Sequence, residues 1–100
     1  MFIIQDLDAC HGVDTVEVCT ESATICEAVF NTGGETCDRH CQSLGLFCEA
    51  GWDDETGDCA SKMTDDPRRV GNGCRIPYGT QICRCSSLEG KLITSKPNQN

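Results

Sequence analysis

Cys37-Asp38-Arg39-His40-Cys41 places two cysteines four residues apart, and Cys83-Arg84-Cys85 places two more cysteines two residues apart. On a helix, side chains four residues apart lie on one face, separated by a rise of about 6 Å. On a strand, side chains two residues apart share a face at a separation of about 6.6 Å. A helix that carries the first pair can therefore lie across a strand that carries the second pair. The spacing predicts two adjacent disulfides that join one helix to one strand.

The composition indicates that the fold depends on disulfides. The 100 residues include ten cysteines but only 19 Leu, Ile, Val and Phe, and the net charge is −8. A chain of this kind tends towards disorder unless it is cross-linked, and each disulfide contributes about 2–4 kcal/mol. The even number of cysteines indicates an oxidising compartment. We therefore expect a secreted, extracellular protein with five disulfides, formed by Cys10, Cys19, Cys26, Cys37, Cys41, Cys48, Cys59, Cys74, Cys83 and Cys85.

The charge balance limits the partners of the protein. Sixteen acidic residues face eight basic ones, which argues against nucleic acid and against anionic membranes as targets. No stretch of 18 apolar residues occurs, so we expect no membrane insertion.

Residues 1–34 are expected to form an N-terminal extension of a single disulfide-rich domain that spans 1–100. Phe2, Ile3, Ile4 and Leu7 could add an edge strand or pack on the core. Asp14-Thr15-Val16-Glu17 resembles a capped helix start. Apolar residues then recur at spacings of three and four, which predicts a helix whose buried face carries Val16, Cys19, Ala23, Cys26, Val29 and Phe30. A strand is the alternative, because β-branched residues alternate from Val16 to Thr20.

Residues 35–86 are expected to form the disulfide core. A second helix should run from Glu35 to Leu44, with Gly45 just past its last turn. A long polar connection follows over 49–73, held by Cys48 and Cys59, and then a hairpin over 74–85 with a turn at Pro77-Tyr78-Gly79. Residues 87–100 should form a flexible tail. The predicted fold class is thus a small disulfide-rich α+β domain, with one or two helices packed on a short antiparallel β-hairpin.

The paired Cys-x-x-x-Cys and Cys-x-Cys motifs resemble those of the cysteine-stabilised αβ superfamily, which includes defensins, scorpion toxins and macins. The resemblance covers residues 35–86 and implies the bridges Cys37–Cys83 and Cys41–Cys85, with Cys74 bonded to Cys26. The chain departs from the family at Asn72, where the family usually has Gly, and in its acidic charge, since the membrane-active members are usually basic.

A second resemblance comes from the N-terminal part. Asp8-Ala9-Cys10, followed by Cys19 and Cys26 in an acidic chain, is similar to the start of the water-borne mating pheromones of ciliates. This resemblance implies a secreted signalling protein.

Two places in the sequence carry side chains that can bind metal ions. His11 and His40 lie beside cysteines, but Cys83-x-Cys85 is too tightly spaced for a structural zinc site, so we expect no metal ligand and no cofactor. Clustered carboxylates could instead hold a calcium ion, although their spacing is not that of an EF-hand and a solvated acidic loop is the simpler interpretation; these are Asp53, Asp54, Glu55 and Asp58.

Two stretches are candidate binding surfaces. Trp52 precedes the acidic cluster and is either a core residue or, if exposed, a binding hot spot beside Asp53 and Asp54. Arg68 and Arg69 lie in a charged stretch that suits partner binding or processing, or is a solvated loop.

The sequence contains no nucleophile motif, phosphate-binding loop or metalloprotease helix, so we expect no enzyme. The predicted function is a secreted signalling ligand, in the manner of a pheromone, growth factor or toxin, that binds a cell-surface protein receptor through rigid disulfide-stapled loops. The alternatives are an adhesion or recognition module of a larger extracellular protein and a host-defence peptide.

Overall fold

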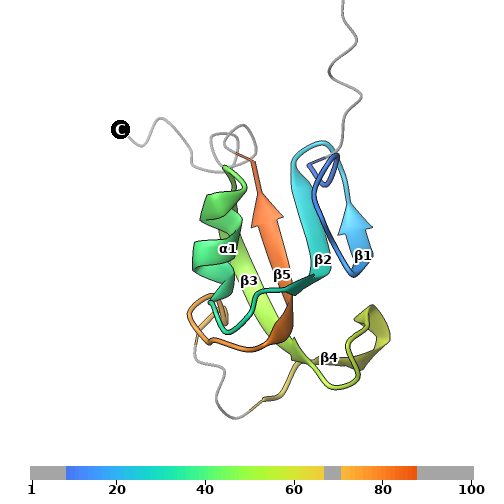
Figure 1. Ribbon diagram of the computed structural model, residues 1–100, viewed down its shortest axis with the longest axis vertical. Coiled ribbons are helices and arrows are strands. Elements are labelled where there is room, and N and C mark those ends of the chain that lie inside the picture. The colour runs from blue at the N-terminus through green and yellow to red at the C-terminus, as the bar shows by residue number, and fades with distance from the viewer. Residues whose placement is uncertain (1–8, 67–70, 88–100) are drawn as a thin grey trace, which may run out of the picture.

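The computed structural model describes residues 9–66 and 71–87, which form a curled antiparallel sheet with α1 (Cys37–Ser43) on one face (Figure 1). The sheet order is β1-β2-β5-β3-β4. Its strands are β1 (Glu17–Glu21), β2 (Ile25–Asn31), β3 (Phe47–Asp54), β4 (Lys62–Met63) and β5 (Thr80–Ser86). The predicted fold class, one or two helices packed on a short hairpin, is therefore wrong, because most of the regular structure belongs to one five-stranded sheet.

The N-terminal helix expected after Asp14 is also wrong, because these residues form the β1–β2 hairpin. The side-chain oxygen of Ser22 accepts hydrogen bonds from the backbone N–H groups of Thr24 (3.3 Å) and Ile25 (3.1 Å) and so closes the turn. A serine can stabilise a turn in this way without glycine or proline. The strand alternative, based on β-branched residues, describes β1 correctly.

The helix predicted over 35–44 is confirmed as α1. The hydroxyl of Thr36 accepts a hydrogen bond from the N–H of Arg39 at 3.1 Å and caps the first turn. At the other end, Gly45 has a φ of 77° and donates to Gln42, while Leu46 donates to Cys41. This pair of bonds is a Schellman motif, which stops the helix at the expected glycine.

The polar connection over 49–73 and the hairpin over 74–85 are only partly correct. The first part of that connection belongs to β3, and β5 pairs with β2 and β3 rather than with Cys74-Arg75-Ile76, which forms no strand in the described structure. β2 lies within residues 1–34 and pairs with β5 along its whole length. The N-terminal region thus supplies two strands of the sheet.

The disulfides confirm the central prediction. Cys37–Cys83 and Cys41–Cys85 join α1 to β5. The implied Cys26–Cys74 bridge is wrong, because Cys26 is bonded to Cys10 and Cys74 to Cys48. The fifth bridge is Cys19–Cys59. Cys48 and Cys59 therefore do anchor the region after β3, each to a different element.

The two faces of the sheet carry different residues. The face under α1 is an apolar and disulfide core that includes Ala28 and Phe30, both fully buried. On the opposite face, Val29 and Ile82 are also fully buried, next to charged side chains. Each strand alternates between these two environments, as expected for a sheet covered on both sides.

A covalent link brings the two edges of the sheet towards each other. Cys19 lies on β1 at one edge, and Cys59 begins the 3-10 turn η2 (Cys59–Ser61), which leads into β4 at the other edge. The sheet therefore curls into a half-barrel (Figure 1). Among the described residues, no helix has the length and apolar character needed to span a membrane.

Candidate interaction surface

An ion-pair network lies on the sheet face opposite α1. Glu27 on β2 is only 5% exposed, and its two carboxylate oxygens accept hydrogen bonds from Lys62 at 2.7 Å and Arg84 at 2.9 Å. Arg84 also donates to Glu49 at 3.1 Å. Burial alone would raise the pKa of Glu27, but the two cations outweigh it and hold that pKa below its usual value. The carboxylate is therefore a charged structural group rather than a proton carrier.

Trp52 is neither fully buried nor a free hot spot. It lies on β3 opposite Ile82 of β5 and is half-buried. The ammonium group of Lys62 lies 4.0 Å from the centroid of the indole ring, in a cation–π contact. Trp52 thus packs against buried Ile82 on the network face, beneath a charged side chain.

The two carboxylates that follow Trp52 have different environments. Asp54 is 5% exposed and accepts a hydrogen bond from the hydroxyl of Thr80 at 3.0 Å, whereas its second oxygen is buried without a hydrogen-bond partner. Burial, together with the nearby charges of Asp53 and Asp58, raises the pKa of Asp54 despite the Thr80 bond. Asp53 is half-buried, and its side chain accepts from the N–H of Asp54 at 2.9 Å. Asp54 is too buried to contact a partner directly.

The acidic loop, residues 55–61, is closely held by local contacts. Asp58 caps η2 by accepting from the N–H of Ser61 at 2.9 Å, and this bond lowers the pKa of Asp58. The carboxylate of Glu17 on β1 accepts from the N–H of Cys59 at 2.9 Å, beside the Cys19–Cys59 disulfide. Glu55 is exposed at the start of the loop. The carboxylate of Glu17 therefore lies against the acidic loop, and Glu17 and this loop are together called the acidic surface.

Two other predictions concern this region. Arg68 and Arg69 lie outside the described residues, so their proposed contact role stays a prediction. Within 9–66 and 71–87, no group of three or more His, Cys, Asp or Glu side chains is arranged to hold a metal ion.

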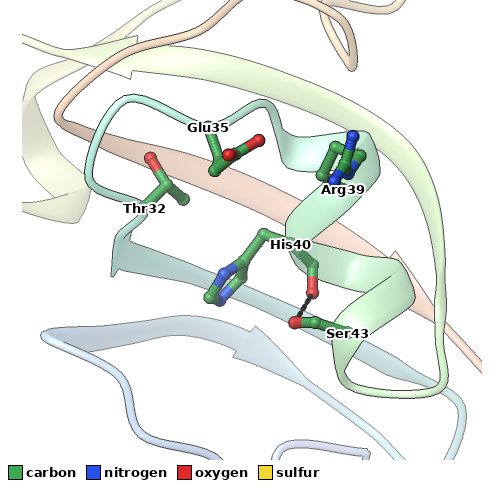
Figure 2. A pocket seen from close by; sticks show the side chains of 5 residues that line it. All are labelled: Thr32, Glu35, Arg39, His40 and Ser43. Atoms are coloured by element: carbon green, nitrogen blue, oxygen red, sulfur yellow. Dashed lines mark hydrogen bonds between the residues drawn. The ribbon is translucent and has the colours of Figure 1, made fainter.

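An open pocket of about 260 Å³ lies beside α1, lined by Thr32, Glu35, Arg39, His40 and Ser43 (Figure 2). The imidazole of His40 points from the helix towards β2, where its centroid is 4.5 Å from that of Phe30. Its Nε2 atom is buried without a hydrogen-bond partner, and burial lowers the pKa of His40. His40 is thus a partly buried residue that packs on Phe30.

The sequence interpretation missed the network of Glu27, Lys62 and Arg84. Glu27 fell within the predicted N-terminal helix and Lys62 within the predicted polar connection over 49–73, so neither was expected on a sheet. The available signal was the alternation around Glu27 and Arg84, since a charge flanked by apolar residues or cysteines on a buried strand needs a partner of opposite charge.

Comparison of the chain with protein-family models, with curated proteins and with solved structures found no match. The structure shows a small disulfide-rich domain with two helix-to-strand bridges, whereas membership of the cysteine-stabilised αβ superfamily stays a prediction. The likeness to ciliate pheromones stays a prediction.

Proposed function

We propose that the protein is a secreted signalling ligand that binds a cell-surface protein receptor through its acidic surface. The observation that carries this proposal is the Cys19–Cys59 disulfide, which fixes the acidic loop against β1. Together with the Asp58 cap, it holds Glu55 and Glu17 on a rigid scaffold before any partner arrives. A pre-organised loop loses little conformational entropy on binding.

The charge distribution supports a basic partner surface. The described residues include 13 acidic side chains but only four basic ones, Arg39, Lys62, Arg75 and Arg84. Two of these four, Lys62 and Arg84, bind the buried Glu27. The outward charge is therefore strongly negative and complements a lysine- or arginine-rich patch on a receptor.

The same proposal includes that the protein acts by binding and not by catalysis. It also includes that neither nucleic acid nor a membrane is its partner. Of the residues first expected at the contact, Asp54 is replaced by Glu55, because Asp54 is buried and Glu55 is exposed.

The test is binding of the fluorescently labelled, oxidised protein to cells of the organism that encodes it. We expect saturable binding that unlabelled protein displaces and that prior reduction of the disulfides abolishes. Glu55→Lys should weaken this binding about three- to tenfold, because it reverses one charge at the contact. Glu35→Lys, at an exposed position before α1, is the matched control and should bind like the wild type. Equal binding by the reduced and oxidised proteins, or no saturable binding, would contradict the proposal.

A further inference from the structure

Strand β1 forms one edge of the sheet. It pairs with β2 on one side, and no other described strand pairs with its second side. Four of its five residues are exposed. The outer side of such a strand presents backbone N–H and C=O groups that a further strand can use.

Exposed apolar side chains gather at this edge. Val16 is 59% exposed and Val18 is 40% exposed, and they are two of the three large hydrophobic residues exposed in the described part of the chain. The helix α1 packs on β3 and β5, away from the β1 edge, so it does not cover Val16 and Val18 (Figure 1). Within the described residues, the edge thus combines a strand side that no other strand pairs with and two exposed apolar side chains.

A β-bulge distributes negative charge over both faces of the edge. The register shifts between Val18 and Thr20, so that Glu17 lies beside Val29 and Glu21 lies beside Cys26. Val29 and Cys26 belong to opposite faces of the sheet, and cross-strand neighbours share a face. A strand that docks on β1 would therefore meet one carboxylate on each face. Neither glutamate forms an ion pair within 9–66 and 71–87.

The direction of one backbone amide follows from the hairpin turn. The N–H of Ser22 donates to the carbonyl of Ile25 at 2.9 Å, across to β2. Because successive residues of an antiparallel strand alternate in direction, the N–H of Glu21 points away from β2. Within 9–66 and 71–87 this amide faces the unpaired side of β1, so its hydrogen exchange reports on an incoming strand.

We infer that the β1 edge binds an extended, lysine- or arginine-rich segment of a protein partner as an added strand. Basic side chains of the segment would meet Glu17 and Glu21, and its apolar side chains would cover Val16 and Val18. This inference rests on the proposed function and names a second contact of the ligand. A second copy of the chain fits less well, because two-fold pairing centred on Cys19 would place Glu17 of one copy opposite Glu21 of the other.

The test uses a synthetic peptide of alternating lysine and valine, titrated into isotopically labelled full-length protein and followed by NMR. We expect chemical-shift changes centred on residues 16–21 and at least about tenfold slower hydrogen exchange of the Glu21 amide at saturation. A peptide of alternating glutamate and valine should not bind. A lysine–valine peptide with a central proline keeps the charge but loses strand pairing, and should bind at least about threefold more weakly.

Matched charge reversals locate the contact. Glu21→Lys should weaken binding of the lysine–valine peptide at least about threefold, whereas Glu35→Lys should change the affinity for this peptide by less than about 1.5-fold. Equal loss in both variants, or binding without slower exchange at Glu21, would overturn the inference in favour of general charge attraction. Two other outcomes would also overturn it. A Glu21 amide already protected in the free chain and released by deletion of residues 1–8 would show that the chain occupies its own edge, and protection that rises with protein concentration would show self-pairing.

The two proposals can fail separately. Saturable cell binding that Glu21→Lys leaves unchanged, with no peptide docking, would remove the β1 contact and leave the proposed function standing. Docking of the peptide at β1 without any saturable cell binding would remove the proposed function and leave the β1 contact standing.

Discussion

Lys62 and Glu27 form an ion pair of 2.7 Å although their strands, β4 and β2, are separated in the sheet by β3 and β5. In a flat sheet, three strand spacings correspond to about 14 Å. Two side chains that meet over this span require the sheet to curl around its charged face. The contact between Lys62 and Glu27 therefore depends on the curvature of the half-barrel.

Loss of the central carboxylate should be costly. Glu27→Gln leaves Lys62 and Arg84 near a neutral group, and we expect the free energy of unfolding to fall by about 2 kcal/mol, less than for a fully buried pair because both cations reach solvent. Urea unfolding with the disulfides intact measures this change.

Glu49→Gln is the control for that substitution. Glu49 is exposed, and Arg84 is its only ion-pair partner within the described residues, so its loss should cost less than about 1 kcal/mol. Equal costs for the two variants would mean that Glu27 contributes no more than a surface ion pair.

Asp54→Asn should stabilise the protein at neutral pH. Burial raises the folded-state pKa of Asp54 above the ordinary value of 3.8, so its contribution to stability is present below that value and is lost as the pH rises through the folded pKa. The amide keeps an acceptor for Thr80 without a buried charge. Thermal unfolding at pH 7 and pH 3 should show a gain that disappears at the lower pH, while Asp65→Asn, at an exposed site, changes little. A loss of stability at pH 7 would refute this prediction.

His40 should make the fold sensitive to mild acid. Burial lowers the folded-state pKa of His40 below the ordinary value of 6.5, so the stability it contributes is present above 6.5 and is lost as the pH falls through the folded pKa. His40→Leu keeps an apolar contact with Phe30 and should reduce the loss of stability between pH 7 and pH 5. His11→Asn, at an exposed residue, is the control. Parallel pH profiles for wild type and His40→Leu would disprove this role.

Gly51 should tolerate no side chain. A Cβ atom there would lie 2.7 Å from the carbonyl oxygen of Gly73 and 2.8 Å from the sulfur of Cys37. Gly51→Ala should lower the free energy of unfolding by about 2 kcal/mol or more and reduce the yield of correctly bridged protein. Gly79→Ala, where an added Cβ meets nothing within 4 Å, should be nearly neutral. Denaturant unfolding and non-reducing peptide mapping compare the two variants.

The sequence predicted the contact between α1 and β5 because disulfide geometry leaves few ways to pair Cys-x-x-x-Cys with Cys-x-Cys. The sequence predicted a helix in place of β1 and β2 because Ser22 forms the turn between them without glycine or proline. With no turn residue to interrupt them, the apolar spacings resembled those of a helix.

The candidate site shows a similar limit. β3 was assigned to a loop because its Gly51 and Asp54 are typical of loops, whereas each is placed by a tertiary neighbour, Gly73 and Thr80 respectively. The acidic loop was identified as a surface, but its pairing with Glu17 depends on the Cys19–Cys59 disulfide, which no local pattern specifies.

The disulfide pairing also determines what happens if a protease cuts the backbone between Met63 and Cys74. The C-terminal piece would carry Cys74, Cys83 and Cys85, and each of these is bonded to a cysteine of the N-terminal piece. The nicked product would remain a covalent two-chain molecule with β5 still between β2 and β3. It would migrate as one species in electrophoresis until a thiol was added, so a cut in this region would release neither piece.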